Sequence, residues 1–239
     1  MITLQSYFQK MFVINLARRP DRLENFQREM KLNGIPLDKI ERFEAYDFPQ
    51  SGITGATKSH RAVIRQIAQG PWERALIFED DAEAITLEKL KAGGFVAQQQ
   101  VWKTHASVLD GYGTLRDRFA YLARFIPAQW DMLWLGGGYG DKPISRVNRH
   151  IIRFGYMKNC AAYGISRNFA REWTKITDST TPPETHAAVD DMFREFANDH
   201  HFYIFQPRLI FTGKVKSDVN GLEASYLFSM TDPVHESMV

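Results

Sequence analysis

The sequence predicts an α/β fold built around a mainly parallel central sheet. Short apolar runs alternate with helical segments over the first 80 residues, as in parallel sheets with crossover helices. Hydrophobic residues make up 44% and charged residues 24% of the chain, which is typical of a globular protein with a sizeable core. No linker or internal repeat divides the chain, so we expect residues 1–239 to form a single domain.

The alternation is clearest near the N-terminus. Residues 11–16 form an apolar run that predicts a buried strand, and Pro20 suits the first turn of a helix because its missing N–H costs nothing there. A second helix is expected over residues 58–69, with Ser59 as a candidate N-cap and Gly70-Pro71 as its stop. Two further strands are expected, at residues 40–45 and 75–78.

The remainder of the chain is less regular. Residues 93–113 are rich in glycine and glutamine, and we expect an insertion or a mobile loop there. A strand expected at residues 132–135 is followed directly by the glycine run 136–140, which matches neither a phosphate-binding loop nor a dinucleotide fingerprint. The other expected elements are helices over 115–126, 168–176 and 187–198 and strands over 160–165 and 202–205.

Several classes of protein are excluded at this level. No apolar run approaches the roughly 18 residues of a membrane span. The single cysteine, Cys160, excludes an internal disulfide and suggests a reducing compartment, so we expect a cytoplasmic protein, with a peripheral position at the inner membrane face as an option. The histidines lack the His-Glu-x-x-His spacing of a zinc hydrolase, and there is no Gly-x-Ser-x-Gly nucleophile motif.

Charge is unevenly distributed along a chain whose net charge is only +2. Eight basic residues lie between Lys142 and Lys175, and six acidic residues follow between Asp178 and Asp199. This pattern fits a solvated basic face followed by an acidic helix. It also fits a basic wall for an anionic ligand beside an acidic catalytic wall, and both interpretations stay open.

Three consecutive carboxylates, Glu79, Asp80 and Asp81, follow the third expected strand. Ligands of open α/β sheets bind at this end of the strands. Adjacent carboxylates repel one another, so a cation would stabilise them, and their hard oxygens suit Mg²⁺ or Mn²⁺. An exposed loop or a helix cap would account for the same residues.

Two further positions have structural and functional interpretations. His60 shares an apolar helix face with Val63 and Ile64, as a buried core histidine would, but it could also form a hydrogen bond that fixes the nearby nucleotide or the acid loop. Asp190 and Asp191 stand early in an expected helix, where acids stabilise the positive end of the dipole. A general base is the functional alternative for this pair.

Taken together, these segments resemble glycosyltransferase family 25, which includes lipooligosaccharide and collagen galactosyltransferases. The match covers roughly residues 11 to 220. It rests on Val13-Ile-Asn-Leu16, Arg18-Arg-Pro-Asp-Arg22, Phe43-Glu-Ala45, Gly55-x-x-x-Ser59-His60, Ala75-Leu-Ile-Phe-Glu-Asp-Asp81, Ala162-Tyr-Gly-Ile-Ser166, Val189-Asp190, Pro207-Arg-Leu-Ile210 and Ser217-Asp218. The resemblance implies a GT-A-like, Rossmann-like fold that binds a nucleotide sugar and a metal ion. It also implies an inverting transfer of a hexose, galactose or glucose, usually from a UDP-sugar.

The resemblance also implies roles for individual residues. Asp81 would be the main metal ligand and Asp190 the catalytic base. Asp191 would be the reserve base, Glu79 or Asp80 would support the metal, and Asp218 is a further candidate ligand. The residues expected near the nucleotide sugar are Asn15, Leu16, Arg22, Ser59, His60, Glu79 and Asp80. Lys142, Arg146 and Lys214 are candidates for added positive charge near the diphosphate or the acceptor.

The acceptor is the least determined part of the prediction. Ala56 and Lys58 depart from the family pattern, which leaves the donor reaction in place and the acceptor open. The candidate acceptors are three kinds of hydroxyl group. They belong to a bacterial surface glycan, as in lipopolysaccharide biosynthesis, to a protein, or to a hydroxylated DNA base. The alternative functions are a nucleotide- or glycan-binding module without turnover and a nucleic-acid-binding domain.

Overall fold

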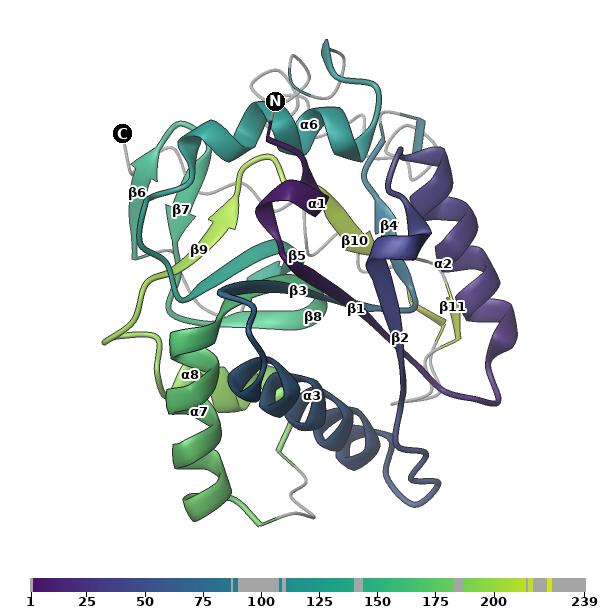
Figure 1. The fold of residues 1–239 in the computed structure, drawn as a ribbon, viewed down its shortest axis with the longest axis vertical. Coiled ribbons are helices and arrows are strands. Elements are labelled where there is room, and N and C mark those ends of the chain that lie inside the picture. The colour runs from purple at the N-terminus through teal and green to yellow at the C-terminus, as the bar shows by residue number, and fades with distance from the viewer. Residues whose placement is uncertain are drawn as a thin grey trace.

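The computed structural model describes residues 2–86, 88–89, 108, 111–139, 144–182, 187–213, 215–216 and 223–224. A twisted sheet crosses the centre of the molecule, with helices on both of its faces (Figure 1). The predicted insertion at residues 93–113 and the residues after 218 lie almost entirely outside the described residues.

The central sheet has eight strands in the order β2-β1-β3-β8-β5-β9-β7-β6. Within it, β1 pairs in parallel with β2 and β3, and β5 pairs in parallel with β9. Only β8 and β7 run against this direction, because β8 is antiparallel to both β3 and β5, and β7 to both β9 and β6. The described strands therefore confirm an α/β fold with a mainly parallel sheet. Their bounds are β1 Lys10–Asn15, β2 Ile40–Glu44, β3 Arg74–Glu79, β5 Met132–Tyr139, β6 Ser145–Asn148, β7 Ile151–Arg153, β8 Met157–Ser166 and β9 Phe202–Phe205.

Two short antiparallel pairs lie outside this sheet. One joins β4 (Ala82–Ala84) to β10 (Ile210–Thr212), with Thr212 opposite Ala82. The other joins β11 (Val215–Lys216) to β12 (Glu223–Ala224). The sequence prediction missed β4, β6, β7 and β10, which are only three or four residues long and are defined by their pairing partners.

The helices begin where local chemistry favours them. Pro20 occupies the first turn of α2, and the side chains of Ser51, Thr114 and Ser166 cap the helices that follow them. The helical elements are α1 Leu4–Tyr7, α2 Pro20–Leu32, η1 Leu37–Lys39, α3 Gly52–Gln69, α6 Leu115–Leu122, η3 Ala123–Phe125, α7 Arg167–Thr180 and α8 Val189–Arg194.

Two expectations about these elements are corrected. The helix predicted from residue 58 begins at Gly52, because Ser51 Oγ accepts a hydrogen bond from the Thr54 N–H and caps it. Ser59 is therefore not the N-cap, since it lies in the middle of α3. The strand predicted at 132–135 continues through the glycines to Tyr139, with register shifts against β8.

The sheet separates two apolar clusters, which fix the helices on its faces. Phe26 and Met30 of α2 pack with Phe119 and Leu122 of α6 on one face. Helices α3, α7 and α8 cover the other face, where Ile64, Trp173 and Phe193 are buried. Figure 1 shows α6 on one side of the sheet and α3, α7 and α8 on the opposite side. In the part of the chain that the structure describes, every helix is too short or too polar to cross a bilayer.

Gly136 allows β10 to pack closely against β5. A Cβ at this position would overlap the carbonyl oxygen of Ile210, which is backbone and has no other rotamer. We expect Gly136→Ala to destabilise the protein by about 3 kcal/mol, the upper part of the range for overpacking, measured by urea unfolding. Gly155→Ala is the control, because its Cβ would meet only Ile144 at 3.6 Å. Equal stabilities of the two variants would contradict this role of Gly136.

Candidate functional site

The site lies at the topological switch point of the sheet, where the strand order reverses. The chain passes from β1 to β2 on one side and then to β3 on the other. Open α/β sheets bind ligands at such a switch point, outside the carboxyl ends of the strands. Asn15 is the last residue of β1 and Glu79 the last of β3, and Asp80 and Asp81 form the turn into β4. Four sequence-predicted residues therefore meet at this edge.

Asn15, Arg22 and Asp80 form a buried polar cluster at this edge. Asn15 Nδ2 donates to Asp80 Oδ2 at 2.7 Å and to the Arg19 carbonyl at 2.9 Å. Arg22 Nη2 lies 2.5 Å from Asp80 Oδ1 and 2.7 Å from Asp81 Oδ2. Arg42 Nε donates to Asn15 Oδ1 at 2.9 Å. Both oxygens of Asp80 are thus engaged within the protein.

Burial and mutual repulsion dominate the electrostatics of these acids. Burial raises the pKa of Asp81 to about 8, the negative charge of Glu79 adds to the effect, and Arg22 opposes it. Burial also raises the pKa of Asp80, again against the effect of Arg22. The guanidinium of Arg22 is therefore the positive charge that stabilises two carboxylates at once.

The residues at this edge fit a divalent cation. Asp81 Oδ1 is buried and has no hydrogen-bond partner among the described residues, whereas its other oxygen contacts Arg22. No three His, Cys, Asp or Glu side chains gather into a metal cluster within the described ranges. Mg²⁺ usually takes only one or two carboxylates and completes its shell with water and substrate phosphates. Asp81 supplies such a carboxylate, with Glu79 beside it, and Asp218 lies outside the described residues.

His60 connects the core to the acid loop. It is therefore both a buried core histidine and a hydrogen-bond partner of that loop. The side chain is 1% exposed. Its Nε2 lies 3.2 Å from Glu79 Oε1, and its Nδ1 lies 2.8 Å from the Tyr163 hydroxyl. Because an ionised carboxylate only accepts, Nε2 carries the proton toward Glu79 and Nδ1 accepts from Tyr163. His60 thus fixes the orientation of Glu79.

Ser59 and Leu16, also predicted near the nucleotide, have different surroundings. The Ser59 hydroxyl is buried, donates to the Gly55 carbonyl at 2.7 Å and accepts from the Tyr46 N–H at 2.9 Å. It therefore holds the connection between β2 and α3. Leu16 is half-buried directly after β1. Contact of either residue with a ligand stays a prediction.

Asp190 and Asp191 differ clearly in their surroundings at the start of α8. Asp190 is partly buried, and its Oδ2 accepts a hydrogen bond from the Asn159 N–H at 3.0 Å. Burial raises the pKa of Asp190, and the charges of Asp191 and Glu79 raise it further. Asp191 is exposed and bonds to the Tyr156 hydroxyl. Of the two, Asp190 therefore fits the predicted role of general base better.

Asp190 and Asp81 lie at the same end of the sheet. Phe78 of β3 pairs with Ala162 of β8. Asp81 stands three residues after Phe78, and Asn159, which holds Asp190, stands three residues before Ala162. Because β3 and β8 are antiparallel, three residues forward from Phe78 and three residues backward from Ala162 lead toward the same end of the sheet. Both carboxylates therefore lie beyond the carboxyl end of β3.

Sequence reasoning missed the residues that connect the Asp190 carboxylate with the backbone of Asp81. Asn159 Nδ2 donates to Thr212 Oγ1 at 2.7 Å, and the Gly213 N–H donates to the Asp81 carbonyl at 2.8 Å. Thr212 ends β10 and Gly213 follows it. The only sequence signal was an asparagine beside an apolar strand, because these contacts arise from pairing between distant segments.

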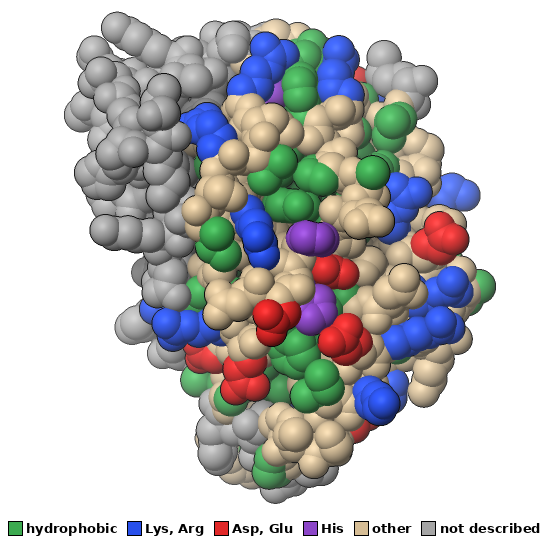
Figure 2. Space-filling view, turned by 90° about the vertical axis from the view of Figure 1, so that its left-hand side faces the viewer, with side chains coloured by type: hydrophobic (Ala, Val, Ile, Leu, Met, Phe, Trp, Pro, Cys, Tyr) green, Lys and Arg blue, Asp and Glu red, His purple; other side chains and the backbone are tan. Residues whose placement is uncertain are grey.

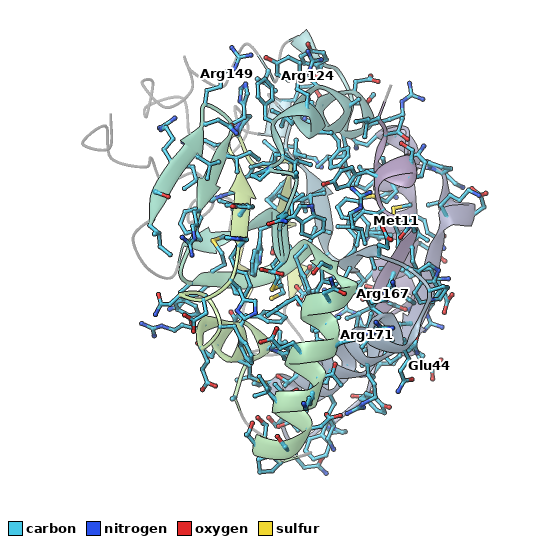
Figure 3. The ribbon with its side chains drawn as sticks, turned by 60° about the vertical axis from the view of Figure 1, so that its left-hand side comes forward. Met11, Glu44, Arg124, Arg149, Arg167 and Arg171 are labelled. Atoms are coloured by element: carbon cyan, nitrogen blue, oxygen red, sulfur yellow. The ribbon has the colours of Figure 1, made fainter. Side chains whose placement is uncertain are left out.

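The described residues of the basic stretch do not form one continuous wall. Arg171 Nε and Arg167 Nη1 donate to the carbonyls of Ala68 and Gly70, which end α3. Arg153 Nη2 donates to the Asn198 carbonyl. Figure 3 shows Arg149 far from Arg167 and Arg171. Lys142 and Lys214 lie outside the described residues, and Arg146 is exposed on β6.

One face of the molecule also shows this dispersal of charge. Figure 2 shows histidine and acidic side chains near its centre, and lysine and arginine side chains dispersed over the face, both beside the central histidine and toward the edges. Nucleic-acid-binding surfaces gather lysine and arginine on one face or along one stripe. The face in Figure 2 offers no such surface among the described residues.

Comparisons with known proteins give distant similarities of fold. No family model matches the chain, and no curated protein matches it. One similar structure is a glycosyltransferase involved in the glycosylation of the major capsid of PBCV-1, with 10% identity and a TM-score of 0.42 over 78% of this chain and 74% of that one. UDP-glucose pyrophosphorylase complexed with UDP-glucose gives 13% identity and a TM-score of 0.43 over 85% and 75% of the two chains. Mannose-1-phosphate geranyltransferase from Thermus thermophilus gives 8% identity and a TM-score of 0.39 over 82% and 72%.

The resemblance to glycosyltransferase family 25 therefore stays a prediction. The same holds for the roles that it implies for individual residues.

Arg22 is expected to be the main stabilising residue of the site. Arg22→Met leaves Asp80 and Asp81 buried without their counter-charge, and breaking a buried ion pair in this way costs about 3–5 kcal/mol. We expect that loss in urea unfolding at neutral pH. Arg18→Met is the control, because the Arg18–Asp47 pair is about half exposed and worth about 1 kcal/mol or less. Similar losses in both variants would contradict the role of Arg22.

Proposed function

We propose that this protein is a metal-dependent, inverting glycosyltransferase that moves a hexose from a nucleotide sugar to an acceptor hydroxyl. The nucleotide sugar is a UDP-sugar and the metal is Mn²⁺ or Mg²⁺. The observation that carries the proposal is the pair of carboxylates at one end of the sheet. Asp81 keeps a buried oxygen without a partner among the described residues, and Asp190 is a partly buried carboxylate held from a different part of the chain. The order of motifs shared with family 25 supports the same activity.

The donor would bind over the carboxyl ends of β1 and β3. Asn15 and Arg22 would lie next to the nucleotide, with Arg42 fixing the orientation of the Asn15 amide. Asp81, with Glu79 beside it, would hold the metal, which when bound supplies positive charge to the leaving diphosphate. His60 keeps the Glu79 carboxylate in place through its Nε2.

Asp190 would act on the acceptor. It would take the proton of the acceptor hydroxyl as that oxygen forms a bond to the anomeric carbon. The bond between this carbon and the diphosphate oxygen breaks, and its electron pair leaves with the nucleoside diphosphate. Because the acceptor attacks from the face opposite the leaving group, the anomeric configuration inverts.

We propose a hydroxyl of a bacterial surface glycan as the acceptor and the cytoplasm as the site of action. Several arginines of the basic stretch are used inside the fold, which weakens the case for DNA. Transfer to oligonucleotides that contain a hydroxylated base would overturn this choice while preserving the donor reaction.

Release of nucleoside diphosphate tests the activity itself. The protein is incubated with a panel of UDP-, GDP- and CDP-sugars, with Mn²⁺ or with a chelator, with and without glycan acceptors. We expect Mn²⁺-dependent release from one UDP-hexose, accelerated by an acceptor glycan. Absence of release from every donor would overturn the proposal, and formation of a nucleotide sugar from UTP and a sugar 1-phosphate would replace it with nucleotidyl transfer.

The pH dependence of transfer is expected to report Asp190. Burial raises the pKa of this carboxyl group, and a general base must be ionised. Activity is therefore complete above the raised pKa and is lost as the pH falls through it. We expect kcat/KM at saturating Mn²⁺ to fall at a pH above the ordinary carboxyl value of about 4. An acidic limb that persists unchanged in Asp190→Asn would assign it to another group.

A further inference from the structure

Asn159 has an uncommon backbone conformation at the edge of the site. Its φ is 68°, and it is the one non-glycine residue with a positive φ in the part of the chain that the structure describes. Asparagine tolerates this left-handed region better than most residues, whereas alanine and β-branched residues do not. Such conformations persist where the surrounding structure enforces them, and they gather at functional sites.

The contacts of Asn159 run toward both halves of the site. Its backbone N–H donates to Asp190 Oδ2 at 3.0 Å, and its side-chain amide donates to Thr212 Oγ1 at 2.7 Å. Gly213, which follows Thr212, donates its N–H to the Asp81 carbonyl at 2.8 Å. One residue therefore connects the candidate base with the segment that is bonded to the candidate metal loop.

The neighbouring strand is shaped around this conformation. Gly137 of β5 also has a positive φ, 152°, and a Cβ there would come within 2.8 Å of the Asn159 carbonyl oxygen. The register of β5 against β8 shifts between Trp134 and Gly136 and again between Gly136 and Gly138, the step that contains Gly137 and faces Asn159. The irregular pairing of β5 and β8, together with the missing side chain of Gly137, thus leaves room for the backbone of Asn159.

We propose that Asn159 is a positioning residue, which sets the place of the Asp190 carboxylate relative to the Asp81 loop. Its left-handed backbone directs the N–H at Asp190, and its side chain ties that backbone to β10. The inference rests on the proposed function and adds to it a residue that neither binds donor nor exchanges protons. The titratable and charged groups around Asp190 are Asp191, Glu79, the Cys160 thiol and, through Asp191, Tyr156 and Arg194.

Two substitutions separate the roles of the backbone and the side chain. Asn159→Gly keeps the left-handed conformation and the N–H, and loses only the bond to Thr212. Asn159→Ala loses the same bond and also disfavours the conformation that directs the N–H. We expect Asn159→Ala to lower kcat at least tenfold, with donor KM within about twofold, because small misplacements of a catalytic group cost up to about 10²-fold. Asn159→Gly should lose about threefold or less.

The pH profile gives a readout that a merely structural role would not move. A hydrogen bond to the ionised carboxylate lowers its pKa, so loss of the hydrogen bond from the residue 159 N–H should move the acidic limb to higher pH in Asn159→Ala and not in Asn159→Gly. In an Asp190→Asn background, Asn159→Ala should cause no further loss of kcat. Equal losses in the two Asn159 variants, or a full further loss in that background, would overturn the proposal.

A second measurement keeps this test independent of turnover. Carbon-13 NMR of the Asp190 carboxyl group follows its titration in the wild type and in both Asn159 variants, with thermal unfolding confirming that each is folded. We expect a higher pKa in Asn159→Ala alone, and unchanged values in both variants would overturn the inference. A wild-type protein that releases no nucleoside diphosphate would refute the proposed function, whichever result the NMR titration gives.

Discussion

Asp190→Asn is expected to lower sugar transfer by about 10²–10⁴-fold, the contribution of a general base, while donor binding stays unchanged. The amide occupies nearly the same volume and still accepts the Asn159 N–H through its oxygen, and it gives up only the exposed bond that Asp190 Oδ1 accepts from the Asp191 N–H at 3.1 Å, so we expect the start of α8 to keep its structure. It cannot take a proton from the acceptor hydroxyl. Steady-state transfer rates and the midpoint of a Mn²⁺–UDP titration measure the two quantities separately.

Asp191→Asn is the matched control for this experiment. It makes the same change one residue further along α8, at an exposed carboxylate that bonds to Tyr156. We expect its transfer rate to stay within about threefold of the wild type, since a surface ion or hydrogen bond is worth about 1 kcal/mol or less. Wild-type turnover in Asp190→Asn, or the larger loss in Asp191→Asn, would remove Asp190 from the mechanism.

Asp81→Asn is expected to abolish the metal-dependent part of nucleotide binding, a loss of about 10²-fold or more in affinity. The substitution removes the carboxyl group whose Oδ1 is buried without a partner among the described residues, and an amide cannot give up a proton to become an anionic ligand. Titration of Mn²⁺ into protein and UDP, followed by the electron paramagnetic resonance signal of the free ion, measures this binding directly.

Glu83→Gln provides the control for Asp81→Asn. It neutralises a carboxylate two residues downstream, on β4, where Glu83 pairs with Lys89 at 2.7 Å. We expect Mn²⁺ and UDP to bind this variant as they bind the wild type. Unchanged Mn²⁺-dependent affinity in Asp81→Asn would show that the metal has other ligands or that the site holds none.

The local pattern of the sequence predicted the part of the site that β1 and β3 carry. Buried strands and amphipathic helices have distinct periods, so their alternation identified the parallel core. The pattern then placed Glu79, Asp80 and Asp81 at the carboxyl end of β3, and the resemblance added Asn15, which the structure joins to Asp80 by a 2.7 Å hydrogen bond. The place of the three acids needed only the strand that precedes them, whereas the choice of Asn15 came from the resemblance to glycosyltransferase family 25.

The sequence could not predict features that depend on contacts between distant segments. The position of β8, antiparallel between β3 and β5, and the pairing of β4 with β10 follow from tertiary packing. Gly55 lies inside α3, before the predicted start of that helix, at a place where a Cβ would come within 2.6 Å of the Tyr46 carbonyl oxygen. The left-handed conformation of Asn159 has no local sequence signature either.

Calorimetric titration of UDP into the protein tests most directly whether the edge formed by β1 and β3 binds a nucleotide through a metal. We predict binding in the presence of Mn²⁺, and its loss both with a chelator and in Asp81→Asn. The unchanged affinity of Glu83→Gln would show that the loss belongs to Asp81. If no nucleoside diphosphate binds with Mn²⁺ present, or if UDP binds equally well with the chelator, the proposed metal-dependent donor site is wrong.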